Sequence, residues 1–255
     1  MPSSSVSTNL ELARIGSPLF IFADSPCCKI GSSSHIDTFA TRLSAQPLKG
    51  GLARSIDAQT RKPTGLLGRL VGSTMVRMKD AAARWTVSLL DLLPESHVLE
   101  VSFGPGVAIQ YGSEKASEGF VAGIDYSETM VQTARKRNAA AIRAGRVELK
   151  HGDVSDLPYP DEFFEKAFAI HSIMFWPKPV DCLQELRRVL KPNGLLAITI
   201  VPKGRRPDLP TDLGTIYDSN EVAAMLSEAG FQDVRVEVFS EPVKFRPDCV
   251  LGVKK

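Results

Sequence analysis

One stretch of the chain carries residues whose types and spacing suit the binding of a nucleotide-like ligand. The segment HVLEVSFGPGV contains Glu100, and then Gly104 and Gly106. A glycine pair after an apolar strand lets the backbone come close to a ligand, because any side chain there would occupy the ligand's space. Asp125 follows at the end of a second apolar run, where its carboxylate can accept hydrogen bonds from both hydroxyls of a ribose. These residues predict a site for an adenosine-containing ligand.

A nicotinamide dinucleotide fits this pattern as well as other adenosine ligands do, and three residues distinguish them. The dinucleotide fingerprint has a third small residue where this chain has Ile109. Glu100 places a carboxylate at the end of the first strand, which suits a ligand ammonium group better than a pyrophosphate. Asp153, in GDVSDLP, can accept a hydrogen bond from an adenine amino group. A Gly-Asp pair after a strand is also common turn chemistry, so both interpretations of Asp153 stay open.

A sheet must bring these residues together, and the hydrophobic pattern predicts one. Apolar strands alternate with amphipathic helices after residue 97, which is typical of an α/β fold with a doubly wound, mostly parallel sheet. The connection between the last two strands has about eight residues, too few for a parallel crossover, so the final strand is predicted to be antiparallel. The expected strands are 97–101, 119–125, 146–153, 165–173, 195–201, 233–240 and 249–254.

The helices between these strands carry recognisable start and stop residues. Ser127 is the expected N-cap of the helix after the second strand, and Gly145 is its expected stop. Near the C-terminus, Ser219 or Asn220 is the expected cap of a helix that stops at Gly230. The expected helices are 107–113, 127–145, 180–190 and 219–230.

The N-terminal part of the chain has a different composition. Residues 1–60 are rich in serine and show no sustained period, so we expect a flexible extension. An organelle-targeting segment and an ordered lid or partner segment are the alternatives. Residues 61–255 are expected to form one α/β domain, with residues 61–93 as a helical lid region. The spacing there predicts an amphipathic helix that ends at Pro94. Its apolar stripe consists of Trp85, Leu89, Leu92 and Leu93.

The bulk composition argues against several classes of protein. The formal net charge of +2 at pH 7 leaves no electrostatic footprint for nucleic acid. No apolar run approaches the ~20 residues of a membrane-spanning helix, so we expect no integral membrane segment and a cytoplasmic location. Cys27, Cys28, Cys182 and Cys249 match neither a disulfide framework nor a zinc-ligand spacing. We therefore expect reduced, structural thiols and no metal site.

Four segments resemble, in order and spacing, successive motifs of the class I S-adenosylmethionine-dependent methyltransferases. They are VLEVSFGPG, GIDYSETM, GDVSDLPYPDEFFEKAFA and LKPNGLLAI. The resemblance covers residues 62–255 and is to the small-molecule branch, methyltransferase type 11, which includes quinone-biosynthesis C-methyltransferases. It implies a Rossmann-like, seven-stranded, mostly parallel sheet with an antiparallel last strand, and S-adenosyl-L-methionine as the cofactor.

The resemblance also implies a role for each matching residue. Glu100 would bind the methionine part of the cofactor, with Gly104 and Gly106 approaching it from the backbone. Asp125 would hold the ribose hydroxyls. The other implied cofactor-binding residues are Ser102, which replaces the first glycine of the motif, Tyr126, Asp153 and the backbone of Val154 around the adenine, and His171 near the reactive end.

Residues around the expected acceptor allow two interpretations each. His171 is the one candidate for a catalytic residue, as a general base, and it is equally interpretable as a hydrogen-bonded wall residue. Trp176 either belongs to the core or forms one wall of the acceptor site. The basic loop containing Lys203, Arg205 and Arg206 is either solvated or recognises an acidic acceptor.

We therefore expect methyl transfer from S-adenosyl-L-methionine to a small molecule, with lipid-like and quinone-like acceptors among the candidates, by in-line displacement. The segment AIHSIMFW lacks the Asn/Asp-Pro-Pro-Tyr-like motif of enzymes that methylate nucleic acids, so no nucleic-acid partner is expected. Two alternatives stay open. One is an NAD-dependent oxidoreductase on a Rossmann-type sheet, and the other is a catalytically degenerate cofactor-binding protein, which the serine at position 102 keeps open.

Overall fold

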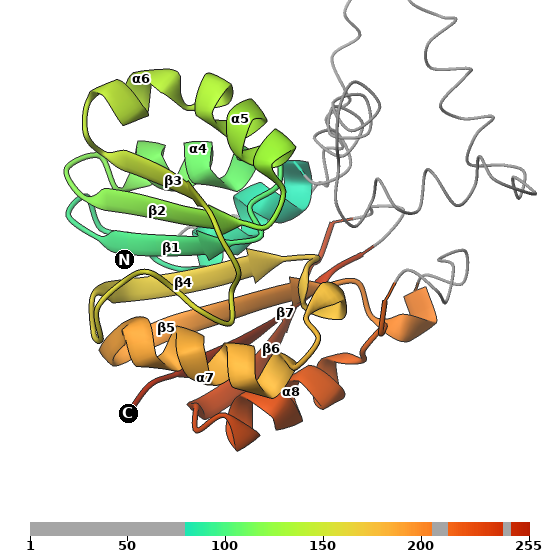
Figure 1. Cartoon of the computed structure of the whole chain (residues 1–255). Helices are drawn as coiled ribbons and strands as arrows, with labels where there is room; N and C mark the ends of the chain where they lie inside the picture. The colour runs from blue at the N-terminus through green and yellow to red at the C-terminus, as the bar shows by residue number, and fades with distance from the viewer. Residues whose placement is uncertain (1–79, 206–213, 242–245) are drawn as a thin grey trace, which may run out of the picture. The chain divides into compact units, whose positions relative to one another are not determined.

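The computed structural model describes residues 80–205, 214–241 and 246–255, which form one seven-stranded sheet in the order β3-β2-β1-β4-β5-β7-β6 (Figure 1). All neighbouring strands from β3 to β5 are parallel, and only β7 runs antiparallel to its neighbours β5 and β6. The predicted fold class is confirmed. The strands are β1 (His97–Val101), β2 (Phe120–Asp125), β3 (Val147–His151), β4 (Phe164–Ile170), β5 (Leu190–Ile200), β6 (Gln232–Val238) and β7 (Asp248–Val253).

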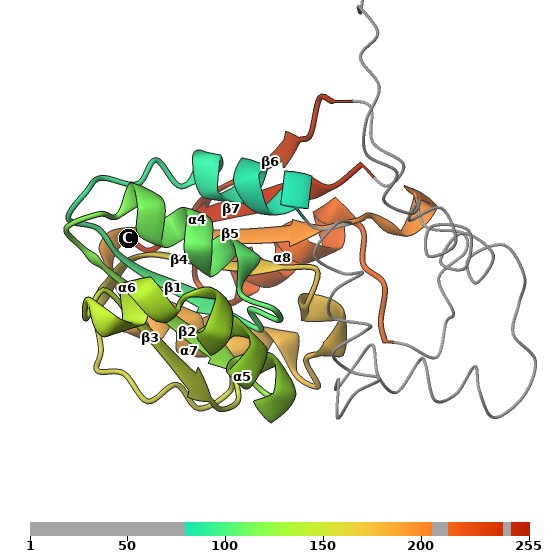
Figure 2. The ribbon, with the colours of Figure 1, turned by 90° about the horizontal axis from the view of Figure 1, so that it is seen from above.

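Helices cover both faces of the sheet, because successive residues of each buried strand point to opposite sides. The helical residues 80–89 and the helices α4 (Val107–Lys115), α5 (Glu128–Arg137) and α6 (Ala139–Arg143) share one apolar core with the first face. The helices α7 (Pro179–Val189) and α8 (Ser219–Glu228) share the other core with the opposite face. Seen from above, the helical residues 80–89 lie beside α4 (Figure 2), and the Tyr111 hydroxyl donates to Asp80 across that contact at 2.5 Å.

Most of the predicted caps are confirmed. The Ser127 hydroxyl accepts from the Met130 N–H at 3.4 Å at the start of α5, and Gly145 and Gly230 have left-handed φ values of 72° and 91° just after α6 and α8. The predicted cap of α8 is wrong by one residue. The N-cap is Asp218, whose N–H is bound by the Glu221 carboxylate at 2.6 Å, because a capping box fixes the helix start.

Three predicted boundaries are also wrong. The expected helix up to Pro94 ends at residue 89, because Asp91 adopts a left-handed φ of 48° and turns the chain; Leu93, expected in the buried stripe, is therefore 56% exposed. The expected helix 127–145 divides into α5 and α6 at Asn138, whose side-chain amide donates to Ala134 O and to Gly106 O. The strand expected at 165–173 ends at Ile170, before a 3-10 turn, η1 (Ile173–Phe175).

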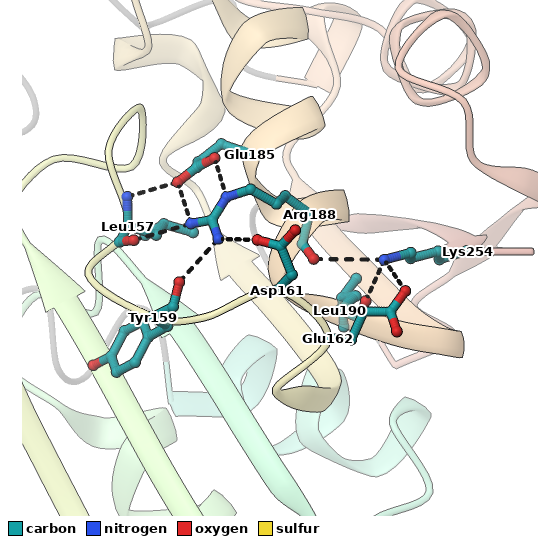
Figure 3. Close-up of polar contacts among 8 residues, drawn as sticks. All are labelled: Leu157, Tyr159, Asp161, Glu162, Glu185, Arg188, Leu190 and Lys254. Atoms are coloured by element: carbon teal, nitrogen blue, oxygen red, sulfur yellow. Dashed lines mark hydrogen bonds and ion pairs between the residues drawn. The ribbon is translucent and has the colours of Figure 1, made fainter.

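A polar network fixes the connection between β3 and β4, which begins at the expected adenine residues (Figure 3). Arg188 on α7 donates to the backbone oxygens of Leu157 and Tyr159 at 3.0 and 2.9 Å. The same guanidinium pairs with Glu185 and Asp161 at 2.7 and 2.6 Å. Hydrogen bonding from Arg188 holds the pKa of Glu185 below its usual value. One side chain thus holds the connection against the helix.

We expect Arg188→Ala to lower the free energy of unfolding by about 3 kcal/mol, because it removes the guanidinium donor to Tyr159 O, one of the two donors to Leu157 O, and the ion pair with Glu185. Urea unfolding of the whole chain measures this loss. Arg143→Ala, on the exposed end of α6, is the matched control, and we expect it to change stability by less than about 0.5 kcal/mol. Equal unfolding midpoints for the two variants would show that the network contributes nothing.

Candidate active site

The carboxyl ends of β1, β2 and β4 meet at one edge of the sheet. β1 lies between β2 and β4, with Val101 opposite Ile124 on one side and Ala169 on the other. The chain leaves β1 toward β2 and returns through β4, so the strand order reverses next to β1. Ligands of open α/β sheets bind at such a switch point. The topology therefore brings the residues that follow these three strands to the same place.

A clasp between the glycine turn and the end of β2 forms the centre of this edge. The Gly104 N–H donates to one oxygen of the Asp125 carboxylate at 2.7 Å. The Ser127 N–H donates to the other carboxylate oxygen at 2.8 Å. Asp125 is 7% exposed, so its carboxylate is held in a fixed orientation by two backbone donors. A fixed acceptor at this edge is suited to the hydroxyls of a sugar.

The two glycines of the turn lack a side chain for different reasons. Both have left-handed φ values, 56° for Gly104 and 74° for Gly106. A Cβ on Gly104 would meet no atom of the described residues within 4 Å. A Cβ on Gly106 would lie 2.6 Å from the Cβ of Ala134 and 2.8 Å from the Asn138 amide nitrogen on the neighbouring helices. Gly104 thus borders open space, whereas Gly106 lets α4 pack against α5; its predicted approach to a cofactor stays a prediction.

Glu100 and Ser102 lie on either side of Val101 and line one small hollow beside the turn. Within the described part of the chain, the hollow is also lined by Ala83, Phe103, Pro105, Val107, Ala108 and Ile170. Glu100 is 2% exposed, and a buried carboxylate is stabilised when a cation pairs with it. The carboxylate in this hollow and the open space at Gly104 fit a ligand that carries an ammonium group and a ribose, as S-adenosyl-L-methionine does.

Ser102 adopts a conformation that favours glycine. Its φ is 56°, and its N–H donates to Ile124 O at 2.7 Å, which ties the turn to β2. A non-glycine residue in the left-handed region costs about 1 kcal/mol or more. The family that the sequence resembles has glycine at this position of the motif. The left-handed φ of Ser102 is the physical reason for that preference.

We expect Ser102→Gly to raise the free energy of unfolding by about 0.5–1 kcal/mol, since relief of the left-handed strain exceeds the entropy that glycine adds to the unfolded chain. Affinity for S-adenosylhomocysteine should be equal or tighter, measured by calorimetry. Asp91→Gly, also left-handed with a φ of 48° but remote from the site, should stabilise the fold without any change in affinity. A tenfold weaker affinity in Ser102→Gly would mean that the hydroxyl binds the ligand.

The expected adenine residues lie at the ends of β2 and β3. Tyr126 is 55% exposed, and its ring stacks on that of His151 with centroids 6.3 Å apart. His151 also bonds Tyr126 O through Nε2 at 2.9 Å. Sequence reasoning missed His151, and its place at the last position of β3 is the only signal for it. Val154 is buried.

Asp153 forms a local turn, which is one of its two predicted interpretations. One oxygen of its carboxylate accepts from the N–H and the hydroxyl of Ser155 at 2.9 and 2.7 Å. Asp153 itself is exposed. The bonds to Ser155 explain the residue type without a ligand, and contact with an adenine amino group stays a prediction.

His171 lies one residue beyond β4, with a left-handed φ of 53° and its N–H donated to Thr199 O at 2.8 Å. It lines a second hollow, with Ser172 and with Ile200 at the end of β5. Its neighbour Ile170 lines the first hollow. The end of β4 therefore has one residue in each hollow, and the role of His171 as base or wall stays open at this point.

Two other predicted features are structural. Trp176 is 7% exposed and belongs to the core beneath α7. Arg205 pairs with the buried Asp248 at 2.5 Å, so it is bound to β7, while Arg206 lies outside the described residues.

Burial raises the pKa of the Cys182 thiol to about 11 and that of Cys249 to about 12. These two thiols are protonated near neutral pH and are poor nucleophiles.

The chain matches the family model described as "Methyltransferase domain" over residues 99–198. This range runs from β1 through most of β5 and contains the glycine turn, Asp125, Asp153 and His171. Residues 1–79, which include most of the expected extension and lid, lie outside the described part of the chain, as do Cys27 and Cys28.

The proteins to which this chain is similar are named as methyltransferases. The uncharacterized methyltransferase YdaC of Bacillus subtilis is 26% identical over 66% of this chain and 89% of its own length. The quinone C-methyltransferase UbiE of Geotalea daltonii is 31% identical, but the match covers only 45% of this chain and 49% of UbiE. A solved S-adenosylmethionine-dependent methyltransferase from Aquifex aeolicus is 27% identical, with a TM-score of 0.59, over 70% of this chain and 92% of that one. These similarities do not favour the NAD-dependent oxidoreductase, which was one of the two alternatives from the sequence.

Proposed function

Since the chain belongs to the class I S-adenosylmethionine-dependent methyltransferases, we propose that this enzyme methylates a small, neutral, quinone-like or lipid-like acceptor. The observation that carries the cofactor site is the clasp in which Gly104 N–H and Ser127 N–H hold the Asp125 carboxylate. The similarity to the quinone C-methyltransferase UbiE supports the acceptor class, although the chain spans about half of that relative's length.

We assign the cofactor contacts as follows. Asp125 accepts hydrogen bonds from the ribose hydroxyls, and Glu100 pairs with the ammonium group in the first hollow. Gly104 leaves room for the ligand, because no atom of the described part of the chain lies within 4 Å of the position of its missing Cβ. Tyr126, stacked on His151, borders the adenine. The remaining assigned contacts are Ser102, Gly106, Asp153, Val154 and His171.

The protein's main contribution to catalysis is alignment. When bound, S-adenosyl-L-methionine supplies a methyl group on a positively charged sulfur; an acceptor electron pair forms the new bond, the sulfur keeps the pair of the broken bond, and the acceptor loses a proton. The residues of β1 and β4 orient the two partners and exclude water. We assign His171 to the wall of the acceptor site, because an acceptor that is already nucleophilic needs no strong base.

No helix in the described ranges is long and apolar enough to cross a membrane, and the proposal places the enzyme in the cytoplasm. No three His, Cys, Asp or Glu side chains of the residues described by the structure are grouped to hold a metal ion.

Calorimetry and a transfer assay test this function. We expect S-adenosylhomocysteine to bind the full chain and NAD to show no binding. With radiolabelled S-adenosyl-L-methionine, label should pass to quinol and phenol acceptors in a panel that also contains amines and an oligonucleotide. Preferential labelling of the amines or of the oligonucleotide would contradict the proposed acceptor class, whereas NAD binding would contradict the cofactor.

A further inference from the structure

The second hollow is built from three segments that backbone hydrogen bonds hold together. The Thr215 N–H donates to Met174 O at 3.1 Å, the Lys203 N–H donates to Tyr217 O at 3.3 Å, and His171 is tied to β5 through Thr199 O. These bonds link the turn after β4, the end of β5 and the segment before α8. Its walls within the described part of the chain are His171, Ser172, Ile173, Met174, Ile200, Val201, Ile216 and Tyr217.

The described walls of this hollow are apolar except for the polar groups of His171, Ser172 and Tyr217. No Lys, Arg, Asp or Glu is among the described wall residues. Ser172 is 4% exposed, and its hydroxyl has no hydrogen-bond partner among the residues that the structure describes. A buried hydroxyl without a partner is destabilising, and a ligand oxygen that bonds it removes this cost. A charged ligand would lose its hydration here without gaining a counter-charge from these residues.

The position of the hollow relates it to the methyl donor. Ile170 lines the hollow that contains Glu100 and Ser102, and His171, the next residue, lines the hollow that contains Ser172. Direct methyl transfer requires that the donor and the acceptor lie close together and in line. Consecutive residues at the end of β4 border both spaces, so the second hollow has the place that an acceptor requires.

We propose that the Ser172 hydroxyl is a specificity-determining group, which bonds an oxygen of an uncharged, ring-bearing acceptor held in the second hollow. This inference rests on the proposed function, whose acceptor it specifies. It predicts selection of phenol-like or quinol-like molecules with one oxygen directed at Ser172. Phosphorylated and amine acceptors are disfavoured, because the described walls contain no Lys, Arg, Asp or Glu.

The test uses 1-naphthol, a neutral two-ring phenol, as the probe, with its fluorescence measured on the full chain saturated with S-adenosylhomocysteine. We expect Ser172→Ala to weaken naphthol binding about fivefold to tenfold, the effect of one hydrogen bond of about 1 kcal/mol or slightly more. Affinity for S-adenosylhomocysteine should be unchanged, and phosphoethanolamine should bind neither protein. Naphthol methylation should show the same change in KM with kcat nearly constant.

Trp176→Phe is the matched control. The Trp176 Nε1, in the same turn, is also buried and has no partner within the described ranges, but Trp176 is not among the described walls of the hollow. Both variants remove an unsatisfied polar group, and only Ser172→Ala should weaken naphthol. Equal naphthol affinity in Ser172→Ala and wild type, or tighter binding of phosphoethanolamine than of naphthol, overturns the inference while S-adenosylhomocysteine still binds. Failure of S-adenosylhomocysteine to bind the wild type instead overturns the proposed function itself.

Discussion

We expect Asp125→Asn to lower the affinity for S-adenosylhomocysteine by about 100-fold or more, because it removes the negative charge of the carboxylate from the clasp. Hydrogen bonds to a charged group contribute about 1.5–3 kcal/mol each, and a carboxylate can accept one from each ribose hydroxyl. The asparagine amide also places an N–H₂ group against the N–H of Gly104 or of Ser127, both of which now donate to Asp125. Because two hydrogen-bond donors then face each other without an acceptor, the variant weakens the turn as well as the ligand site.

Calorimetry with S-adenosylhomocysteine measures this affinity, and thermal unfolding shows whether the variant is folded. The matched control is Asp156→Asn, an exposed carboxylate on the connection after β3, whose affinity should stay within about twofold of wild type. If the folded Asp125→Asn variant binds the ligand as tightly as Asp156→Asn does, Asp125 does not hold the ribose.

Alanine at the two glycines of the turn separates binding from packing. Gly106→Ala should lower the free energy of unfolding by about 3 kcal/mol, because it combines a left-handed alanine with a clash against the Ala134 Cβ at 2.6 Å. Gly104→Ala should cost only about 1 kcal/mol, since no residue described by the structure has an atom within 4 Å of the new methyl group. That methyl group would occupy the proposed ligand space, so ligand affinity should fall at least about tenfold.

Urea unfolding with and without S-adenosylhomocysteine measures both effects in one experiment. A ligand that binds the native state raises stability according to its concentration and affinity. We expect the ligand to stabilise the wild type strongly and Gly104→Ala weakly. Two results would count against this division: a Gly104→Ala variant that is stabilised as much as wild type, or a Gly106→Ala variant that is as stable as Gly104→Ala.

Local pattern was sufficient to predict the sheet. Each strand has an apolar run and each helix has an apolar face, and these periods depend only on the chain's own geometry. The short link before β7 dictated an antiparallel last strand, since no crossover fits into it. Ser127, Gly145 and Gly230 acted as the predicted helix signals because capping depends on neighbours in the sequence.

Helix ends were less predictable where one residue ended the helix while the apolar spacing of the sequence continued. Leu92 and Leu93 continue the spacing of the helix that contains Trp85, but the left-handed Asp91 turns the chain before them. Likewise, the helix after β2 breaks at Asn138, whose amide bonds Gly106 O from 32 residues away. Spacing alone carries no information about such contacts.

By itself, the sequence determined which residues stand at strand ends: Glu100, Asp125, Asp153 and His171 follow apolar runs that are visible in the chain. Only the tertiary structure decided what each one does there. It gave Gly106 a packing partner on α5, bound Asp153 into its own turn with Ser155, and buried Ser172 beside an apolar hollow. It also set Ser102 and His171 at left-handed angles. These outcomes depend on distances between residues far apart in the chain, which close packing fixes and local propensity does not.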